Sequence, residues 1–249
     1  MYFRWRKDVN NIILIGAQGS GKGTQAEKLK CALGLRHISS GDLFRKAFDE
    51  KTSLGLKARA YVDRGELVPD SITVAMVLEQ IEQLGRVQGV LLDGFPRTIV
   101  QAQALDRGLQ RSRRSIDKAV YLEVPREELR TRLSGRYICR ANQHVYNSST
   151  QRPKVSGMCD LDGSELYQRT DDKGEAVNKR LNTFFSETIQ LLSYYEKQQK
   201  LIRVNGNQDI DSVYFDVLSS LHEEILQERA LSLQPWQLPA SPNTVQPRF

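Results

Sequence analysis

The chain has 249 residues, of which 39% are hydrophobic and 27% charged, a balance typical of a folded protein with a large core. Its formal net charge of +6 allows either a nucleic acid or a polyanionic small molecule as partner. No apolar run approaches the roughly 18 residues that span a bilayer, and the first residues lack the apolar stretch of a secretion signal. We therefore expect a cytoplasmic protein without a membrane partner, and three cysteines are too few for a disulfide framework.

Short apolar segments alternate with longer stretches of helical period along most of the chain. The strand-like segments are 12–15, 35–38, 89–92, 119–124 and 201–204, and the helical stretches are 22–33, 71–84, 126–134, 174–199 and 209–229. This alternation predicts an α/β fold in which a five-stranded parallel sheet is covered by helices on both faces. Ligands of such sheets bind at the carboxyl ends of the strands.

Three regions depart from this alternation. Residues 40–68 are rich in helix formers but contain no strand, and residues 137–168 place turn formers between short β-prone pieces. Each is interpreted as an insertion that can move against the core. The last residues, 230–249, hold four of the eight prolines without a periodic pattern, which predicts a disordered tail.

The first predicted strand runs directly into a glycine-rich loop, Gly16-Ala17-Gln18-Gly19-Ser20-Gly21-Lys22-Gly23-Thr24. The glycines let the backbone curl so that successive amide groups point inward, and the following helix adds the positive end of its dipole. Lys22 supplies a charge for terminal phosphates. Because the loop lies between a strand and a helix, it predicts a P-loop that binds phosphate.

Two further motifs carry polar and basic side chains close to predicted strand ends. They are Ser39-Ser40-Gly41-Asp42-Leu43-Phe44-Arg45 and Asp93-Gly94-Phe95-Pro96-Arg97. Phosphoryl transfer needs charge stabilisation and in-line placement of two polyanions more than a strong base, so arginine and lysine should outnumber histidine in the site. Only three histidines exist and none lies in a motif, so we interpret His37, His144 and His222 as structural or solvated.

Together these motifs and the arginines downstream closely resemble adenylate kinases of the bacterial long-lid type, over residues 10 to 226. The resemblance implies a P-loop NTPase-type sheet with two insertions and reversible phosphate transfer from Mg-ATP to AMP, giving two ADP and serving purine nucleotide homeostasis. It also implies a core of 1–39, 69–130 and 173–229, an AMP-binding insertion of 40–68 and a lid of 131–172. No heptad or apolar stripe suggests anything but a monomer, and ATP, AMP and ADP are the expected partners, without nucleic acid.

On the ATP side, the resemblance assigns the phosphates to the glycine loop and to arginines of the lid and its hinge. The residues implied are Gly19, Ser20, Gly21, Lys22, Gly23, Thr24, Arg132, Arg136, Val145, Tyr146 and Gln208. Asp93 and Thr24 would hold Mg²⁺, with Asp93 acting through water. Gly23 stands where other P-loops carry a metal-binding Ser or Thr, so indirect coordination follows.

On the AMP side, the matching positions place Arg45 and Arg97 on the phosphate and Gln101 on the adenine. The full set implied is Ser40, Arg45, Glu66, Leu67, Val68, Gly94, Phe95, Pro96, Arg97, Gln101, Arg169 and Arg180. The side chains expected to act in catalysis are Lys22, Arg97, Arg132, Arg136, Arg169 and Arg180.

Other readings remain open at this point. One is a kinase of the same architecture with a GTP donor or a UMP or CMP acceptor, although the long lid and Ser40 favour ATP and AMP. Another is a nucleotide-binding regulator that does not turn over, and a third is a nucleic-acid-binding protein, which predicts a steep salt dependence of binding.

In many relatives the lid is pinned by zinc, and the matching positions here are Cys139, Asn142, Cys159 and Asp162. The spacing is intact, but an amide is a poor zinc donor, so three ligands would bind the ion weakly unless His144 joins them. The competing arrangement is a lid held by hydrogen bonds among the same four side chains, and we expect this second arrangement.

Overall fold

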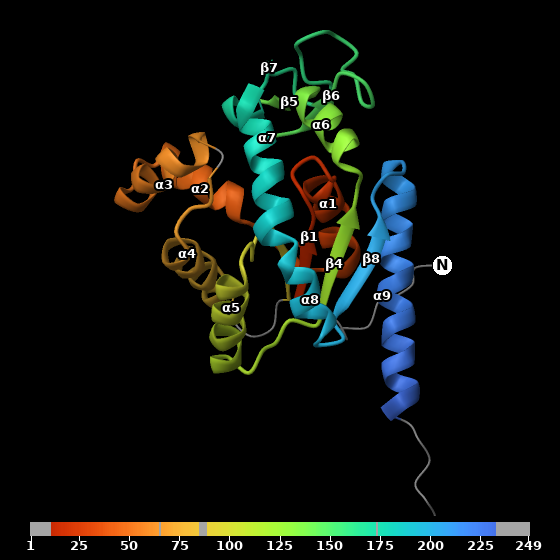
Figure 1. The fold of residues 1–249 in the computed structure, drawn as a ribbon. Coiled ribbons are helices and arrows are strands. Elements are labelled where there is room, and N and C mark those ends of the chain that lie inside the picture. The colour runs from red at the N-terminus through yellow and green to blue at the C-terminus, as the bar shows by residue number, and fades with distance from the viewer. Residues whose placement is uncertain (1–10, 65, 85–88, 173, 233–249) are drawn as a thin grey trace, which may run out of the picture.

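In the computed structural model, which describes residues 11–232 apart from 65, 85–88 and 173, five parallel strands form the central sheet (Figure 1). Their spatial order is β2-β3-β1-β4-β8, with every neighbouring pair parallel. The strands are β1 Asn11–Ile15, β2 Arg36–Ser39, β3 Val90–Asp93, β4 Lys118–Glu123 and β8 Leu201–Asn205. The predicted fold class is confirmed, and the predicted strands agree with these bounds to within one or two residues.

Helices cover both faces of this sheet, and the central strand is buried at every position. Ile12 and Leu14 of β1 pack on one face against α1 and α9, whereas Ile13 and Ile15 contribute to the core on the other face. The flanking helices are α1 Lys22–Leu33, α4 Asp70–Gln83, α5 Ile99–Arg111, α6 Arg126–Ser134, α7 Gly174–Thr183, α8 Gln190–Glu196 and α9 Ile210–Ser232. None of the helices in the described part of the chain is long and apolar enough to cross a membrane.

Two helices differ from the sequence-based expectation. The helix expected over 174–199 is divided by a π-helical turn, Phe184–Thr188, into α7 and α8. Helix α5 was not predicted; its first turn is capped by Thr98, whose side chain accepts a hydrogen bond from the backbone N–H of Gln101. Helix α9 ends at Ser232, and the rest of the expected tail, residues 233–249, lies outside the described residues.

The segment 40–68 contains α2 Ser40–Asp49 and α3 Ser53–Asp63, which share a small apolar cluster around Phe44, Ala58 and Val68. The two helices approach so closely at Gly55 that a Cβ there would lie 2.2 Å from the carbonyl oxygen of Ala47. This contact explains the glycine inside a helix that otherwise disfavours it.

A second, antiparallel sheet of order β6-β5-β7 lies beyond the carboxyl ends of the central strands (Figure 1). Its strands are β5 Arg136–Cys139, β6 Val145–Asn147 and β7 Leu166–Tyr167, followed by the 3₁₀ turn Thr170–Asp172 that leads into α7. Its buried cluster consists of only Cys139, Tyr146, Cys159 and Leu166. A unit with so little apolar area needs additional crosslinks to be stable.

Candidate functional site

The glycine loop connects β1 to the first turn of α1 at the carboxyl edge of the sheet. Gly19 and Gly21 have φ values of +85° and +91°, a conformation that residues with a side chain rarely adopt. Gly21 is also the N-cap of α1, so the amide groups of the loop and the positive end of the helix face the same space. This arrangement can bind an anion without any side chain.

Lys22 lies at the centre of this loop. Its Nζ donates hydrogen bonds to the carbonyl oxygens of Gly16 and Ala17, at 2.7 and 2.8 Å. The pKa of Lys22 is lowered to about 8, chiefly by burial; Asp93 opposes this shift, while the charges of Arg97, Arg136 and Arg180 contribute to it. These charges act on the ammonium because all of these side chains line one cavity.

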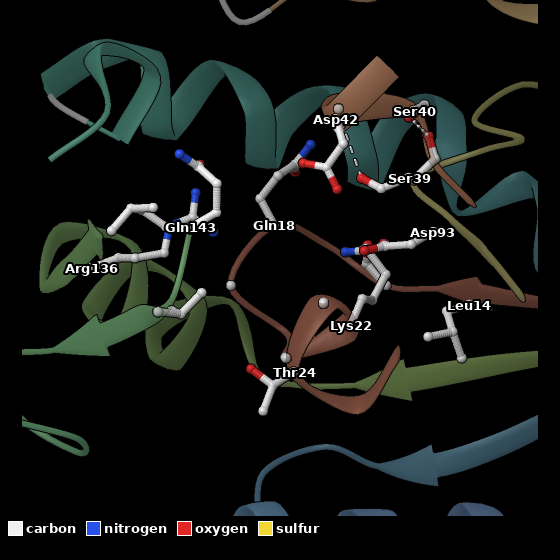
Figure 2. Close-up of a pocket in the computed structure, with 18 of the residues that line it drawn as sticks. Leu14, Gln18, Lys22, Thr24, Ser39, Ser40, Asp42, Asp93, Arg136 and Gln143 are labelled. Carbon is white, nitrogen blue, oxygen red and sulfur yellow. Dashed lines mark hydrogen bonds between the residues drawn. The ribbon is translucent and has the colours of Figure 1, made fainter. Parts of the chain in front are cut away.

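Asp93 ends β3 beside Lys22, and Figure 2 shows the two side chains next to each other. Burial alone would raise the pKa of Asp93, but the nearby His37 ring and the charge of Lys22 hold it below its usual value, so the carboxyl is ionised. His37, on the neighbouring strand, lies between Asp93 and Glu27, with ring nitrogens 3.8 and 3.2 Å from their carboxylate oxygens. Although burial opposes protonation, these two acids raise the pKa of His37.

The acceptor half of the cavity is organised by the carbonyl oxygen of Gly94. Ser40 Oγ and Arg97 Nε donate to it at 2.7 and 2.8 Å, and burial lowers the pKa of Arg97 to about 10. Gln101 is almost fully buried: its Oε1 accepts from the Arg97 backbone N–H and its Nε2 donates to Asp70. Both ends of this amide are therefore held by protein groups.

Four arginines reach the cavity from the lid and its hinge, and they differ in how they are held. Arg136 makes a bidentate pair with Asp172, at 2.7 and 2.5 Å, and Arg180 donates to the same carboxylate at 2.8 Å and to Asp171 at 3.0 Å. Arg169 donates to Gln143, while its buried Nε has no hydrogen-bond partner in the part of the chain that the structure describes. Arg132 turns to Glu128 and to the loop after β8.

The cavity has a volume of about 1360 Å³ and collects nearly all of the residues expected from the sequence. Of the expected nucleotide and magnesium residues, only Ser20 and Phe95 do not line it. Phe95 packs in the core, and the buried Ser20 hydroxyl has no hydrogen-bond partner among the described residues.

The lid contains a separate polar cluster at the turns between its strands. The expected hydrogen bonds from Cys139 and Asn142 to Asp162 are present, at 3.0 and 2.8 Å. Cys159, the remaining side chain of the expected set, contacts His144 instead: the Nδ1 atom of His144 lies 3.3 Å from Cys159 Sγ and also 3.3 Å from Asp162 Oδ2. The ligand atoms of Cys139, His144, Cys159 and Asp162 all lie within 4.8 Å of one another. Interpreting His144 as merely structural or solvated was therefore incomplete.

Comparison with known proteins agrees with this geometry. The family model described as adenylate kinase matches residues 14–200. The adenylate kinase of Carboxydothermus hydrogenoformans is 46% identical over 212 residues, which cover 85% of this chain and 99% of that protein. The adenylate kinases of Staphylococcus aureus (strain Mu50) and Staphylococcus epidermidis are each 46% identical over 211 residues, or 85% of this chain and 98% of each relative.

This chain belongs to the adenylate kinase family. Its activity is that of a phosphotransferase, in which ATP and AMP are converted to ADP. The cavity suits this family because it offers one glycine loop and two groups of guanidinium side chains to a pair of phosphorylated ligands.

Sequence analysis missed several polar residues of the site. Asp171 and Asp172 hold two of the arginines, and His37 contacts the metal-binding candidate Asp93. The acidic pair Asp171-Asp172, two positions after Arg169, was the available signal, since clustered arginines need carboxylate partners. Gln143 gave no comparable signal, because only the fold brings it to Arg169.

The substitution Asp172→Asn should lower the free energy of unfolding by about 3–5 kcal/mol, because it leaves two buried guanidinium groups without their shared carboxylate. Urea denaturation followed by circular dichroism measures this change. The matched control is Glu165→Gln, which breaks an exposed pair with Arg140 and should cost about 0–1 kcal/mol. Equal costs for the two substitutions would contradict a structural role for the buried carboxylate.

Proposed function

We propose that the cavity holds ATP and AMP together, with the ATP phosphates on the glycine loop and AMP beneath the 40–68 segment. This proposal depends on one observation: a single cavity is lined by Lys22 and by three arginines, Arg97, Arg136 and Arg180. The arginines are close enough for their charges to lower the pKa of Lys22. A site for one phosphate group would not need cations on both sides. Two polyanions meeting end to end would need them.

The transfer follows from this arrangement. An oxygen of the AMP phosphate forms a bond to the terminal phosphorus of ATP as the bond to the bridging oxygen breaks, so both products are ADP. Lys22 and the forked guanidinium groups of Arg136, Arg169 and Arg180 stabilise the charge on the transferring group, while Arg97 and Arg45 orient the acceptor phosphate. Closure of the 131–172 lid and the 40–68 segment would exclude water, which otherwise competes as acceptor.

Base recognition and the remaining nucleotide contacts are proposed from the same geometry. Glu66, Leu67, Val68 and Gln101 line the acceptor half of the cavity, and Val145, Tyr146 and Gln208 line the donor half. The cytoplasmic location, the monomeric state and the absence of a nucleic-acid partner stay predictions from the sequence.

The residues at the end of β3 fit a magnesium ion. The Asp93 carboxyl is ionised, and a Cβ on Gly23 would lie 3.7 Å from its Oδ2, so the missing side chain leaves room beside a carboxylate oxygen. Asp93 and the Thr24 hydroxyl would hold the ion, oxygen ligands of the kind Mg²⁺ prefers. When bound, the ion neutralises charge on the phosphate oxygens.

The lid cluster fits a zinc ion through a ligand set that differs from the one expected. In a tetrahedral site with bonds of about 2.0–2.3 Å, neighbouring ligand atoms lie roughly 3.3–3.8 Å apart. The three distances of 3.0 to 3.3 Å among Cys139, His144, Cys159 and Asp162 are close to this range. We infer that His144 takes the place that the spacing assigned to Asn142.

The activity is tested by offering ATP with AMP, GMP, CMP and UMP in turn and measuring ADP formation. We expect AMP to be the preferred acceptor. Arg97→Ala should reduce transfer on the order of a thousandfold with the fold intact, because the buried guanidinium orients the acceptor phosphate. Arg107→Ala, on the exposed side of α5, is the control. Near-normal transfer by Arg97→Ala would remove that residue from the mechanism.

The pKa of about 8 for Lys22 predicts a pH dependence. Only the ammonium form attracts phosphate, so kcat/KM for ATP should fall about tenfold per pH unit above pH 8 as the free enzyme loses this proton. The kcat/KM for AMP at saturating ATP serves as the control, because bound phosphate raises the pKa of Lys22 and should keep this value constant through pH 8. If kcat/KM for ATP and kcat/KM for AMP had the same pH dependence between about pH 7 and 10, the assignment of this titration to Lys22 would be wrong.

The zinc proposal predicts about one zinc ion per chain in protein purified without chelator, measured by inductively coupled plasma mass spectrometry. His144→Ala and Cys139→Ser should lose the ion and lower the melting temperature, whereas Asn142→Ala should retain it. A metal-free wild-type protein would mean that hydrogen bonds alone hold the lid. Zinc loss confined to Asn142→Ala would mean that the ligand assignment is wrong.

A further inference from the structure

Gln143 occupies a backbone conformation that is unfavourable for its type. Its φ is +59°, within the turn that connects β5 to β6, where its N–H donates to the carbonyl oxygen of Cys139 at 3.0 Å. The described residues contain three other non-glycine residues with positive φ: Lys51, Arg113 and Gln199. Of these four, Gln143 alone lines the nucleotide cavity. Strained backbone at such a place is a reason to look for a function in its side chain.

The Gln143 side chain points into the cavity from the lid, beside Arg136 (Figure 2). Its Oε1 accepts a hydrogen bond from Arg169 Nη2 at 3.1 Å. The conformation of the turn therefore brings a neutral acceptor to one of the arginines assigned to the phosphates. Asn142 and His144, the residues on either side, both contact Asp162 in the lid cluster, which fixes the turn from which Gln143 extends.

Arg169 is held differently from Arg136 and Arg180. Those two share the carboxylate of Asp172, whereas the described residues include no carboxylate within ion-pair distance of Arg169. Burial together with the charges of Arg45 and Arg136 lowers its pKa to about 10, so the guanidinium lies in a crowded cationic environment. Its buried Nε has no hydrogen-bond partner among the described residues. The amide of Gln143 is thus the side chain that fixes the direction of this guanidinium.

A neutral acceptor has a specific advantage here. The guanidinium is charged with either acceptor, but a carboxylate adds the attraction of a full negative charge, so it would compete more strongly with the incoming phosphate. An amide holds the guanidinium in place and releases it at a smaller cost.

We propose that Gln143 is a positioning residue that keeps Arg169 directed into the cavity between turnovers and releases it to the phosphate when nucleotide binds. This inference rests on the proposed function, because it assumes that Arg169 contacts phosphate during transfer. In this proposal the strained β5–β6 turn contributes to catalysis by placing Gln143 next to Arg169. The same turn also connects the lid cluster to the phosphate site, because Asn142 and His144 belong to that cluster.

Three substitutions at this position separate the side chain from the backbone. Gln143→Met keeps the side-chain length and the strained φ but removes the acceptor, so kcat/KM for AMP should fall about tenfold or more, the range of one hydrogen bond to a charged group. Gln143→Glu supplies a charged acceptor that competes with phosphate, so KM for AMP should rise about tenfold. Gln143→Gly relieves the strain, so the melting temperature should rise by roughly 2 °C while activity falls as in Gln143→Met.

The matched control is Gln199→Gly, since Gln199 has the same side chain and a φ of +57° but does not line the cavity. It should raise the melting temperature similarly and leave the kinetic constants unchanged. In an Arg169→Lys background, Gln143→Met should have no further effect, because both substitutions remove the same interaction.

The outcomes distinguish this inference from the proposed function. If the wild-type protein does not phosphorylate AMP, the proposed function fails. If the wild type is active but Gln143→Met and Gln143→Gly have the same kinetic constants as Gln199→Gly, the positioning role is wrong. It is also wrong if the effects of Gln143→Met and Arg169→Lys on kcat/KM are additive.

Discussion

Electrostatic repulsion among buried cations is the constraint that organises this structure. Lys22, Arg97, Arg136, Arg169 and Arg180 line one cavity, and burial or neighbouring positive charge lowers the pKa of four of them. Such a cluster is stable only where each charge finds a partner. The fold therefore supplies carbonyl oxygens for Lys22, a shared carboxylate for Arg136 and Arg180, and an amide for Arg169.

The parallel sheet makes this clustering possible because all five strands end at the same edge. Adjacent strand ends place the glycine loop, Ser39 and Asp93 side by side, with Ser39 of β2 in register with Asp93 of β3. Arg97 follows β3, and Arg180 lies on α7, which packs in the core of the sheet. Arg136 and Arg169 come from the lid, which has a buried cluster of its own. Movement of the lid would then change the distance between cations and anions within the cavity, which links nucleotide binding to closure.

The sequence predicted those parts of the structure that depend on local pattern. The inner strands β1, β3 and β4 were recognisable because both of their faces are covered, which produces nearly continuous apolar runs. Helix α5 escaped notice because its first turn carries the exposed Val100 and buried Gln101 in place of a regular apolar stripe. The arginine partners could not be predicted, because no spacing rule states which carboxylate meets which guanidinium across 36 positions, as Arg136 and Asp172 do.

The lid cluster shows the same limit at closer range. The cysteine spacing predicted Asn142, three positions after Cys139, as a member of the cluster. Spacing carries no information on how the β5–β6 turn orients the side chains of Gln143 and His144 that follow it. In the folded lid Asn142 donates to Asp162, while His144, the first residue before β6, brings its ring to Cys159 and Asp162. A tertiary contact between two turns thus decides which side chains meet in the cluster.

The existing partners of the arginines also bear on turnover. When a phosphate enters, each guanidinium exchanges an internal acceptor for a phosphate oxygen, so the net free energy of binding is the difference between two interactions of similar kind. Binding would therefore be weaker than the number of arginines suggests, and the products can leave. An enzyme that must act reversibly on nucleotides in both directions needs this balance, since tight binding of ADP would slow release without stabilising the transition state. In the proposed mechanism the acidic pair at Asp171 and Asp172, which binds Arg180, would set the strength of the competition that phosphate has to overcome.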